Sequence, residues 1–98
     1  MLVVPKVHTE TLTDLPVDDV GPFFTCVQRV TGAVERAMGS TGTFVAMNNR
    51  VSQSVPHLHV HDVPRTKGDG LRGFFWPRTK YSSDSEAQAV ADRIKEAL

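Results

Sequence analysis

Residues 55–64 read VPHLHVHDVP, and this stretch decides how the chain folds. Three of the chain's four histidines stand here at every second position, with Leu58 and Val60 between them. Successive side chains of a strand point to opposite faces, so an extended backbone places all three imidazoles on one face and the aliphatic side chains on the other. A helix would scatter the histidines, because a step of two residues turns by about 200°. The spacing therefore predicts a strand with one chemical face and one core face.

Such a row of imidazoles suits either a metal ion or an anion. Alternate residues of a strand lie roughly 6.6 Å apart, so three ligands on one strand do not converge on a single tetrahedral ion, although two histidines can chelate one. Imidazole has a near-neutral pKa, so it can act as a nucleophile and as a hydrogen-bond donor to phosphate. We therefore favour phosphate chemistry. A metal site and a purely structural row are the alternatives.

The bulk properties of the chain exclude several classes of protein. Its 98 residues predict one domain, residues 1–98, with a small core. Because 11 basic side chains face 11 acidic ones, no net positive charge favours a nucleic-acid partner. The single cysteine, Cys26, excludes an internal disulfide and is typical of a reducing compartment. No apolar run is long enough for a membrane span, so we expect a cytoplasmic protein without a membrane partner.

The first half of the chain predicts a strand and a long helix. Residues 1–4 are apolar and largely β-branched, and Pro5 ends that strand. Residues 16–38 carry apolar side chains at spacings of three and four, which predicts an amphipathic helix that ends at the 39–42 cluster. Gly21-Pro22 predicts either a kink or a helix start near Pro22. Cys26 lies beside the apolar stripe, so we interpret it as packing material.

The second half predicts two strands and a helix. Residues 43–48 and the histidine strand, which we expect to run to about Arg65, are joined by a polar loop and should pair antiparallel. Residues 66–70 form a turn, and the aromatic and basic side chains of residues 71–81 are expected in packing or a subunit contact. Ser83 or Ser85 caps a last helix, whose apolar stripe is expected on the sheet. The fold class is α+β: an antiparallel sheet with one long helix and a C-terminal helix.

The histidine stretch resembles the signature of the histidine triad (HIT) family, His-x-His-x-His followed by two residues that are usually apolar. The flanks resemble the family as well. Asn48-Asn49 and Gln53-Ser54-Val55 are similar to its Asn-Asn-Gly...Gly-Gln-Ser/Thr-Val approach, and Pro64-Arg65 and Gly68-Asp69-Gly70 to its downstream loop. Three differences stand out: Asp62 replaces an apolar residue, Arg50 replaces a glycine, and the loop is about two residues shorter.

The resemblance implies a nucleotide hydrolase or nucleotidyltransferase acting at the α-phosphate of a nucleoside phosphoramidate or a dinucleoside polyphosphate. It implies a nucleotidyl-histidine intermediate on His59, with no metal and no cofactor. The other catalytic residues that it implies are His57, His61 and His8, and the phosphate-binding residues are Asn48, Gln53 and Ser54. It also implies a homodimer that forms through the long helix and an adjacent strand.

The family carries a hairpin ahead of the strand at residues 1–4, with contacts to base and ribose. We therefore expect this HIT-like domain to be incomplete at its N-terminus. The same expectation supports an alternative function, a nucleotide-binding or partner-binding module with little or no turnover.

Overall fold

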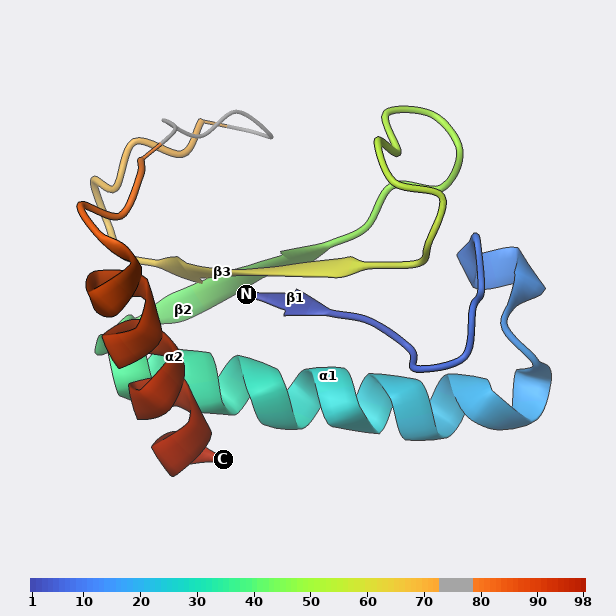
Figure 1. The fold of residues 1–98 in the computed structure, drawn as a ribbon, viewed down its shortest axis with the longest axis horizontal. Helices are drawn as coiled ribbons and strands as arrows, with labels where there is room; N and C mark the ends of the chain where they lie inside the picture. The colour runs from blue at the N-terminus through green and yellow to red at the C-terminus, as the bar shows by residue number, and fades with distance from the viewer. Residues whose placement is uncertain (73–78) are drawn as a thin grey trace.

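The structure is a computed structural model, and it describes residues 1–72 and 79–98. Three strands, two helices and a short 3-10 helix follow one another as β1 (Leu2–Val3), η1 (Leu12–Asp14), α1 (Val17–Met38), β2 (Gly42–Ala46), β3 (Val60–Arg65) and α2 (Asp84–Ala97). The strands form an antiparallel sheet in the order β1-β3-β2, with β3 in the middle. The long helix α1 covers one face of this sheet, and α2 packs near its C-terminal end (Figure 1). The α+β prediction is confirmed.

The core lies between α1 and the sheet, as the spacing of apolar residues predicted. Phe23 and Val27 of α1 pack in one buried cluster with Leu58 and Val60. Leu58 and Val60, the two aliphatic residues between the histidines, are 0% exposed. Fully burying such a side chain stabilises the fold by about 1.5–3 kcal/mol. The core face of this stretch therefore fixes which way the histidines point.

Helix α1 begins earlier than one of its two predicted starts. It runs unbroken from Val17, with Pro22 inside it, so the predicted start near Pro22 is wrong. The helix ends at Gly39, which has a φ of 60°, the left-handed conformation that glycine adopts most readily. The backbone N–H groups of Gly39 and Ser40 both donate to the carbonyl of Glu35 and so satisfy the end of the helix.

The histidine strand is shorter than predicted. β3 begins at Val60, so His57 and His59 precede it. The reason is the two partner strands: β2 ends at Ala46, which pairs with His61, and β1 ends at Val3, which pairs with Val60. The segment before β3 is held instead by the N-terminal part of the chain, where the N–H of Leu58 donates to the carbonyl of Thr9 at 2.6 Å. Burial still alternates along the stretch, because Leu58 and Val60 remain in the core.

Helix α2 packs on a helix rather than on the sheet, which corrects the predicted location. Its Ile94 joins Ala33 and Val34 of α1 in a second buried cluster. Its contacts with the other elements are made to α1, which itself covers one face of the sheet. Ser83 caps α2 as predicted: its Oγ accepts a hydrogen bond from the N–H of Glu86.

Two predictions about side chains have different outcomes. Cys26 is exposed on α1, so its interpretation as packing material is wrong within this chain. The prediction for the aromatic and basic segment, residues 71–81, falls mostly on residues 73–78, which lie outside the described residues. Within the described ranges, neither helix is long and apolar enough to cross a bilayer.

Candidate functional site

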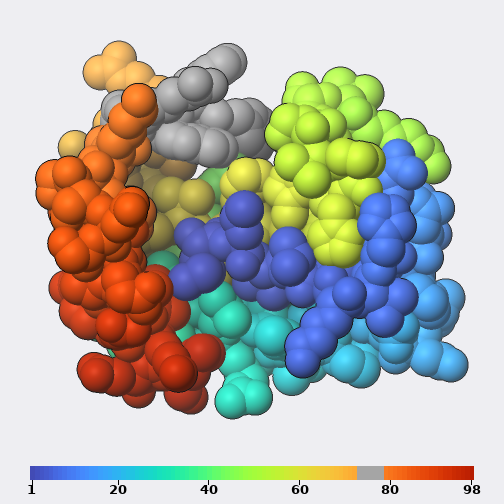
Figure 2. Space-filling view, viewed as in Figure 1, coloured from blue at the N-terminus to red at the C-terminus, as the bar shows by residue number. Residues whose placement is uncertain are grey.

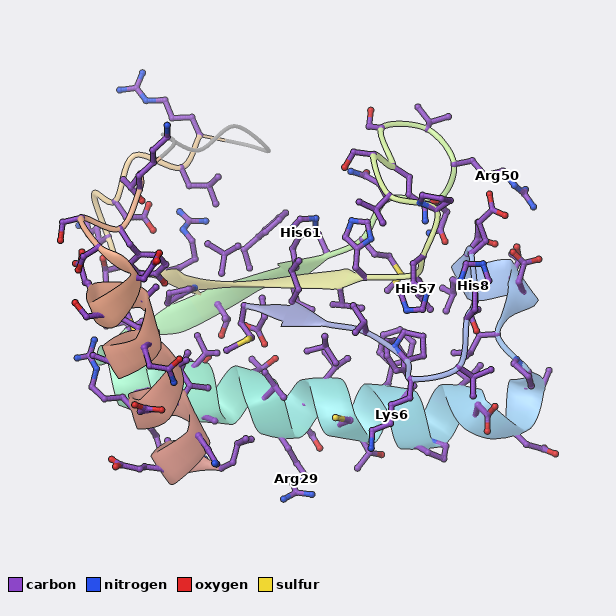
Figure 3. All side chains as sticks on the ribbon, viewed as in Figure 1. Lys6, His8, Arg29, Arg50, His57 and His61 are labelled. Atoms are coloured by element: carbon purple, nitrogen blue, oxygen red, sulfur yellow. The ribbon has the colours of Figure 1, made fainter. Side chains whose placement is uncertain are left out.

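His59 and His61 line a cavity of about 350 Å³ on the face of the sheet that α1 does not cover. His61 points away from α1 in Figure 3. The antiparallel register places Ala46 of β2 directly opposite His61, and the small alanine side chain leaves open space beside the imidazole. Side chains of β2 and of the loop after it complete the lining: Phe44, Met47, Asn48, Ser52 and Ser54. The cavity thus has an apolar floor and a polar rim beside two imidazoles.

The hydrogen bond of His59 fixes its tautomer. Its Nδ1 lies 2.7 Å from the carbonyl oxygen of His57, and a carbonyl can only accept. Nδ1 therefore carries the hydrogen, and the neutral ring keeps its lone pair on Nε2. The rings of His59 and His61 meet edge to face, with centroids 5.2 Å apart. This arrangement gives the cavity one oriented imidazole with a nucleophilic nitrogen.

His57 and His8 form a second pair outside the residues that line this cavity. Their Nδ1 atoms are 3.3 Å apart, and the two labelled side chains lie together in Figure 3. The Nε2 of His57 lies 3.0 Å from the carbonyl oxygen of Pro5, so Nε2–H donates to that carbonyl. In the neutral ring of His57, Nδ1 is then an acceptor, and His8 donates to it. The sequence pointed to His57 and His8 individually but not to their direct contact.

The loop between β2 and β3 is braced by its own amide side chains. Gln53 accepts from the N–H of Arg50 at 2.7 Å and donates to the carbonyl of Glu10 at 2.6 Å. Asn49 accepts from the N–H of Leu12 at 2.7 Å, so the loop is tied to the N-terminal segment, as the contact of yellow-green and blue atoms in Figure 2 shows. The structure places Asn48 and Ser54 at the cavity but not Gln53. The carboxamide of Gln53 holds backbone groups.

Two residues of this loop have backbone angles that favour glycine. Arg50 has a φ of 66° and Ser52 a φ of 59°. L-residues other than glycine and asparagine rarely adopt this left-handed region. The family pattern has a glycine before the glutamine, so Ser52, like Arg50, stands at a glycine position. That signal could have identified Ser52 as a residue of the cavity, which the sequence interpretation missed.

Electrostatics favour the neutral form of His61. Partial burial lowers the pKa of His61 below its usual 6.5, and the neighbouring His59 and the N-terminal ammonium lower it further. Among the residues that the structure describes, no group of three His, Cys, Asp or Glu side chains could hold a metal ion. The polar side chains that line the cavity are imidazoles, hydroxyls and a carboxamide.

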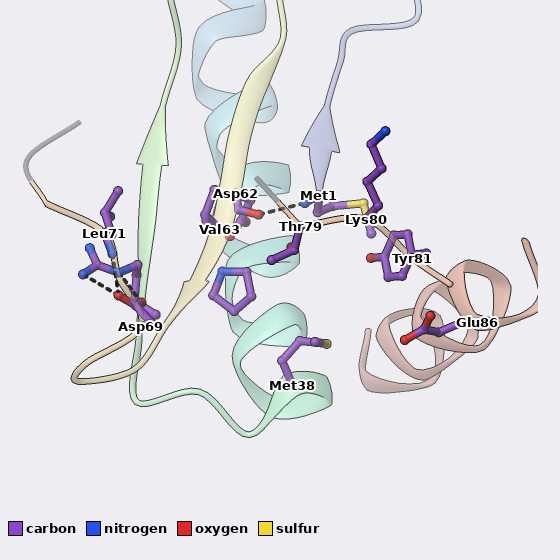
Figure 4. Close-up of a pocket in the computed structure, with 12 residues that line it drawn as sticks. Met1, Met38, Asp62, Val63, Asp69, Leu71, Thr79, Lys80, Tyr81 and Glu86 are labelled. Carbon is purple, nitrogen blue, oxygen red and sulfur yellow. Dashed lines mark hydrogen bonds and ion pairs between the residues drawn. The ribbon is translucent and has the colours of Figure 1, made fainter. Parts of the chain in front are cut away.

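A larger cavity, of about 720 Å³, lies beside β3 and Met1, next to the start of β1 (Figure 4). It contains no histidine. Arg65 and Asp69 form an ion pair at 2.6 Å on its wall, and the hydrogen bond from Arg65 lowers the pKa of Asp69 to about 2. This pair closes the turn after β3, because Asp69 also accepts from the N–H groups of Thr66 and Leu71. The smaller cavity, which carries the imidazoles, is therefore the candidate active site.

Comparisons with known proteins point to one family. A family model described as "HIT domain" matches residues 1–68. The asymmetrical bis(5'-nucleosyl)-tetraphosphatase of Schizosaccharomyces pombe is 32% identical to this chain over 71 residues, covering 70% of this chain and 39% of that protein. An uncharacterized HIT-like protein of Mycobacterium tuberculosis is 31% identical over 102 aligned positions, covering 99% of this chain and 67% of that protein.

A solved structure agrees over nearly the whole chain. The crystal structure of a Hit-like protein from Bartonella henselae superposes with a TM-score of 0.83 at 28% sequence identity, covering 99% of this chain and 69% of that chain. This chain therefore spans from about two fifths to about two thirds of the lengths of these proteins.

Proposed function

The chain belongs to the histidine triad (HIT) family, and we propose that it is a hydrolase or transferase acting at the α-phosphate of a nucleoside phosphoramidate or dinucleoside polyphosphate. Relatives named as nucleotide hydrolases support the reaction class. The observation that carries the proposal is the hydrogen bond from His59 Nδ1 to the carbonyl of His57. It orients an imidazole with its lone pair on Nε2 in a cavity rimmed by neutral hydrogen-bonding groups.

The proposed reaction has two displacements. His59 Nε2 attacks the α-phosphorus, the bond to the leaving group breaks, and a nucleotidyl-histidine forms. Water then attacks the same phosphorus and releases the nucleoside monophosphate, which restores the imidazole. Splitting one difficult displacement in this way is nucleophilic catalysis, and donors around the phosphorus stabilise the charge that develops on its oxygens.

The other site residues divide by location. His61, Asn48 and Ser54 line the cavity, so we assign them to the phosphoryl oxygens and the leaving group. His57 and His8 act through the backbone and through each other, which makes them positioning residues for His59. The phosphate-binding role of Gln53 stays a prediction, although its amide already serves the loop. The homodimer also stays a prediction, because the structure describes a single chain.

A nucleotide-binding module with little turnover is the alternative function, and one experiment separates the two. Adenosine 5'-phosphoramidate is mixed with the protein, the reaction is stopped with alkali, and the intact mass and the released AMP are measured. The enzyme should release AMP and show a transient gain of one adenylyl group, and His59→Ala should show neither. AMP binding without either signal in the wild type would favour the binding module. Full turnover by His59→Ala would exclude His59 as the nucleophile.

A further inference from the structure

Ser52 lines the candidate active site in a backbone conformation that serine rarely adopts. Its φ is 59°, where a side chain crowds the backbone and a glycine does not. Strained positions of this kind are concentrated at ligand-binding and catalytic sites, where the surrounding structure enforces them. The strain by itself does not identify a role, because Arg50 in the same loop is strained in the same way. The location of Ser52 at the cavity distinguishes the two residues.

The backbone of Ser52 is held, whereas its side chain is exposed and its hydroxyl makes no hydrogen bond to the described residues. The side chain of Asn48 donates to the carbonyl of Ser52 at 3.3 Å, which anchors the strained residue against the end of β2. Across residues 1–72 and 79–98, no hydrogen bond involves the hydroxyl of Ser52. A serine hydroxyl offers one donor and two acceptor positions. The loop thus presents an unpartnered donor to the same cavity as His59.

We propose that Ser52 is a substrate-binding residue whose hydroxyl donates a hydrogen bond to a non-bridging oxygen of the α-phosphate. This proposal rests on the proposed function and extends it to a residue at a glycine position of the family pattern. The phosphate is the fitting partner because its oxygens only accept, and the polar rim that Ser52 shares with Asn48 and Ser54 lies beside the imidazoles. A serine at this φ strains the backbone more than a glycine would, but its hydroxyl supplies an additional contact to the phosphate.

The chain supplies a matched control for this proposal. Arg50→Gly relieves a left-handed residue with a φ of 66° in the same loop; Arg50 is exposed like Ser52, but it does not line the cavity. Ser52→Gly relieves the same kind of strain and removes the hydroxyl. Ser52→Ala removes the hydroxyl and keeps the strain. The three variants together separate the effect of the backbone from the effect of the hydroxyl.

The experiment measures thermal stability, the affinities for AMP, adenosine and inorganic phosphate by calorimetry, and kcat/KM for adenosine 5'-phosphoramidate. Both glycine variants should melt at a higher temperature than the wild type. Ser52→Gly and Ser52→Ala should each weaken AMP binding by about ten- to a hundredfold, the loss expected for one hydrogen bond to a charged group. Adenosine binding should not change in either serine variant. Arg50→Gly should keep the wild-type affinity for AMP.

Different failures have different meanings. Wild-type affinity for AMP in Ser52→Gly would overturn the role of Ser52 while the proposed function stands. A wild type that binds AMP but does not hydrolyse the phosphoramidate would remove the proposed function, and the loss of AMP affinity in the serine variants would still support the phosphate contact. A wild type that binds neither AMP nor inorganic phosphate would overturn both.

Discussion

The four histidines of this chain form two pairs with opposite surroundings. His59 and His61 meet edge to face in a cavity, whereas His8 and His57 face each other through Nδ1 atoms 3.3 Å apart and do not line it. In the second pair, both ring nitrogens of His57 hydrogen-bond to other protein groups: Nδ1 contacts His8, and Nε2 donates to the carbonyl of Pro5. The comparison shows that the same side chain can line a cavity or brace the backbone, and on this basis we propose His59 as the reacting group and His57 as a positioning residue.

The backbone explains why the pairs separate. The N–H of Leu58 donates to the carbonyl of Thr9, and this bond sets the N-terminal segment beside the histidine stretch, so that His8 comes to lie next to His57. Two residues further on, β3 begins and gains β2 as a second neighbour, so that His61 pairs with Ala46 of β2 as well as with Leu2 of β1. The added strand brings His59 and His61 to a cavity that His57 and His8 do not line.

The strongest test of whether the two histidine pairs have different roles is to remove one member of each pair. His59→Ala should lower kcat/KM for adenosine 5'-phosphoramidate by on the order of a thousandfold or more, because no other group replaces the nucleophile. His8→Ala should lower it by about tenfold, the effect of one lost hydrogen bond that orients a neighbour. Steady-state kinetics at matched protein concentration measure both. Equal losses in the two variants would contradict the division into site and brace.

The next test removes a buried side chain, Leu58, that lies in the core beneath the histidine stretch. Leu58 is fully buried beneath the stretch, so Leu58→Ala should lower the free energy of unfolding by about 2–5 kcal/mol. Val55 is 54% exposed and serves as the control, and Val55→Ala should change the free energy of unfolding by less than about 0.5 kcal/mol. Urea unfolding followed by fluorescence gives both values. A small loss for Leu58→Ala would mean that the core face does not hold the histidines in place.

The comparison also shows how far the sequence alone reached. The alternation of Leu58 and Val60 with the histidines predicted two faces, because a period of two needs only an extended backbone. The three-and-four spacing predicted α1 for a similar local reason. The partner of His57 could not be predicted, because His8 reaches it through a tertiary contact across 49 positions of the chain. The role of Gln53 depends in the same way on a distant carbonyl, that of Glu10.

Asp62 shows a second limit of the pattern. It follows Leu58 and Val60 on the core face and is 0% exposed, as the alternation requires of an apolar residue. Its Oδ2 accepts a hydrogen bond from the hydroxyl of Thr31 on α1 at 2.8 Å. Its other oxygen, Oδ1, is buried and has no hydrogen-bond partner among the described residues, so the helix satisfies only one of the two carboxylate oxygens. The period of a pattern predicts where a side chain lies, and only the tertiary structure shows what it contacts.

The smallest effect that we expect is a pH dependence of stability caused by His61, one of the two histidines that line the cavity. Because the pKa of His61 is lowered below 6.5 in the folded protein, the unfolded chain binds more protons than the folded one between the two pKa values. Stability should therefore rise with pH through that window and keep the full contribution of His61 above pH 6.5. Since the ring is only partly buried, solvent screening keeps the contribution small. Protonation is disfavoured mainly because the ring is partly buried.

His61→Gln tests this prediction by removing the titrating group and keeping a polar side chain. Urea midpoints of the wild type and the variant are compared between about pH 5 and pH 8, the range in which histidine titrates. Below pH 6.5, the urea midpoint of the variant should rise less steeply with pH than that of the wild type. Above pH 6.5, the two plots of midpoint against pH should run parallel. An NMR titration of His61 in the wild type checks the same pKa directly. A midpoint above 6.5, or equal slopes in both proteins, would mean that the cavity favours a charged His61 and would reverse the assignment of a neutral imidazole beside His59.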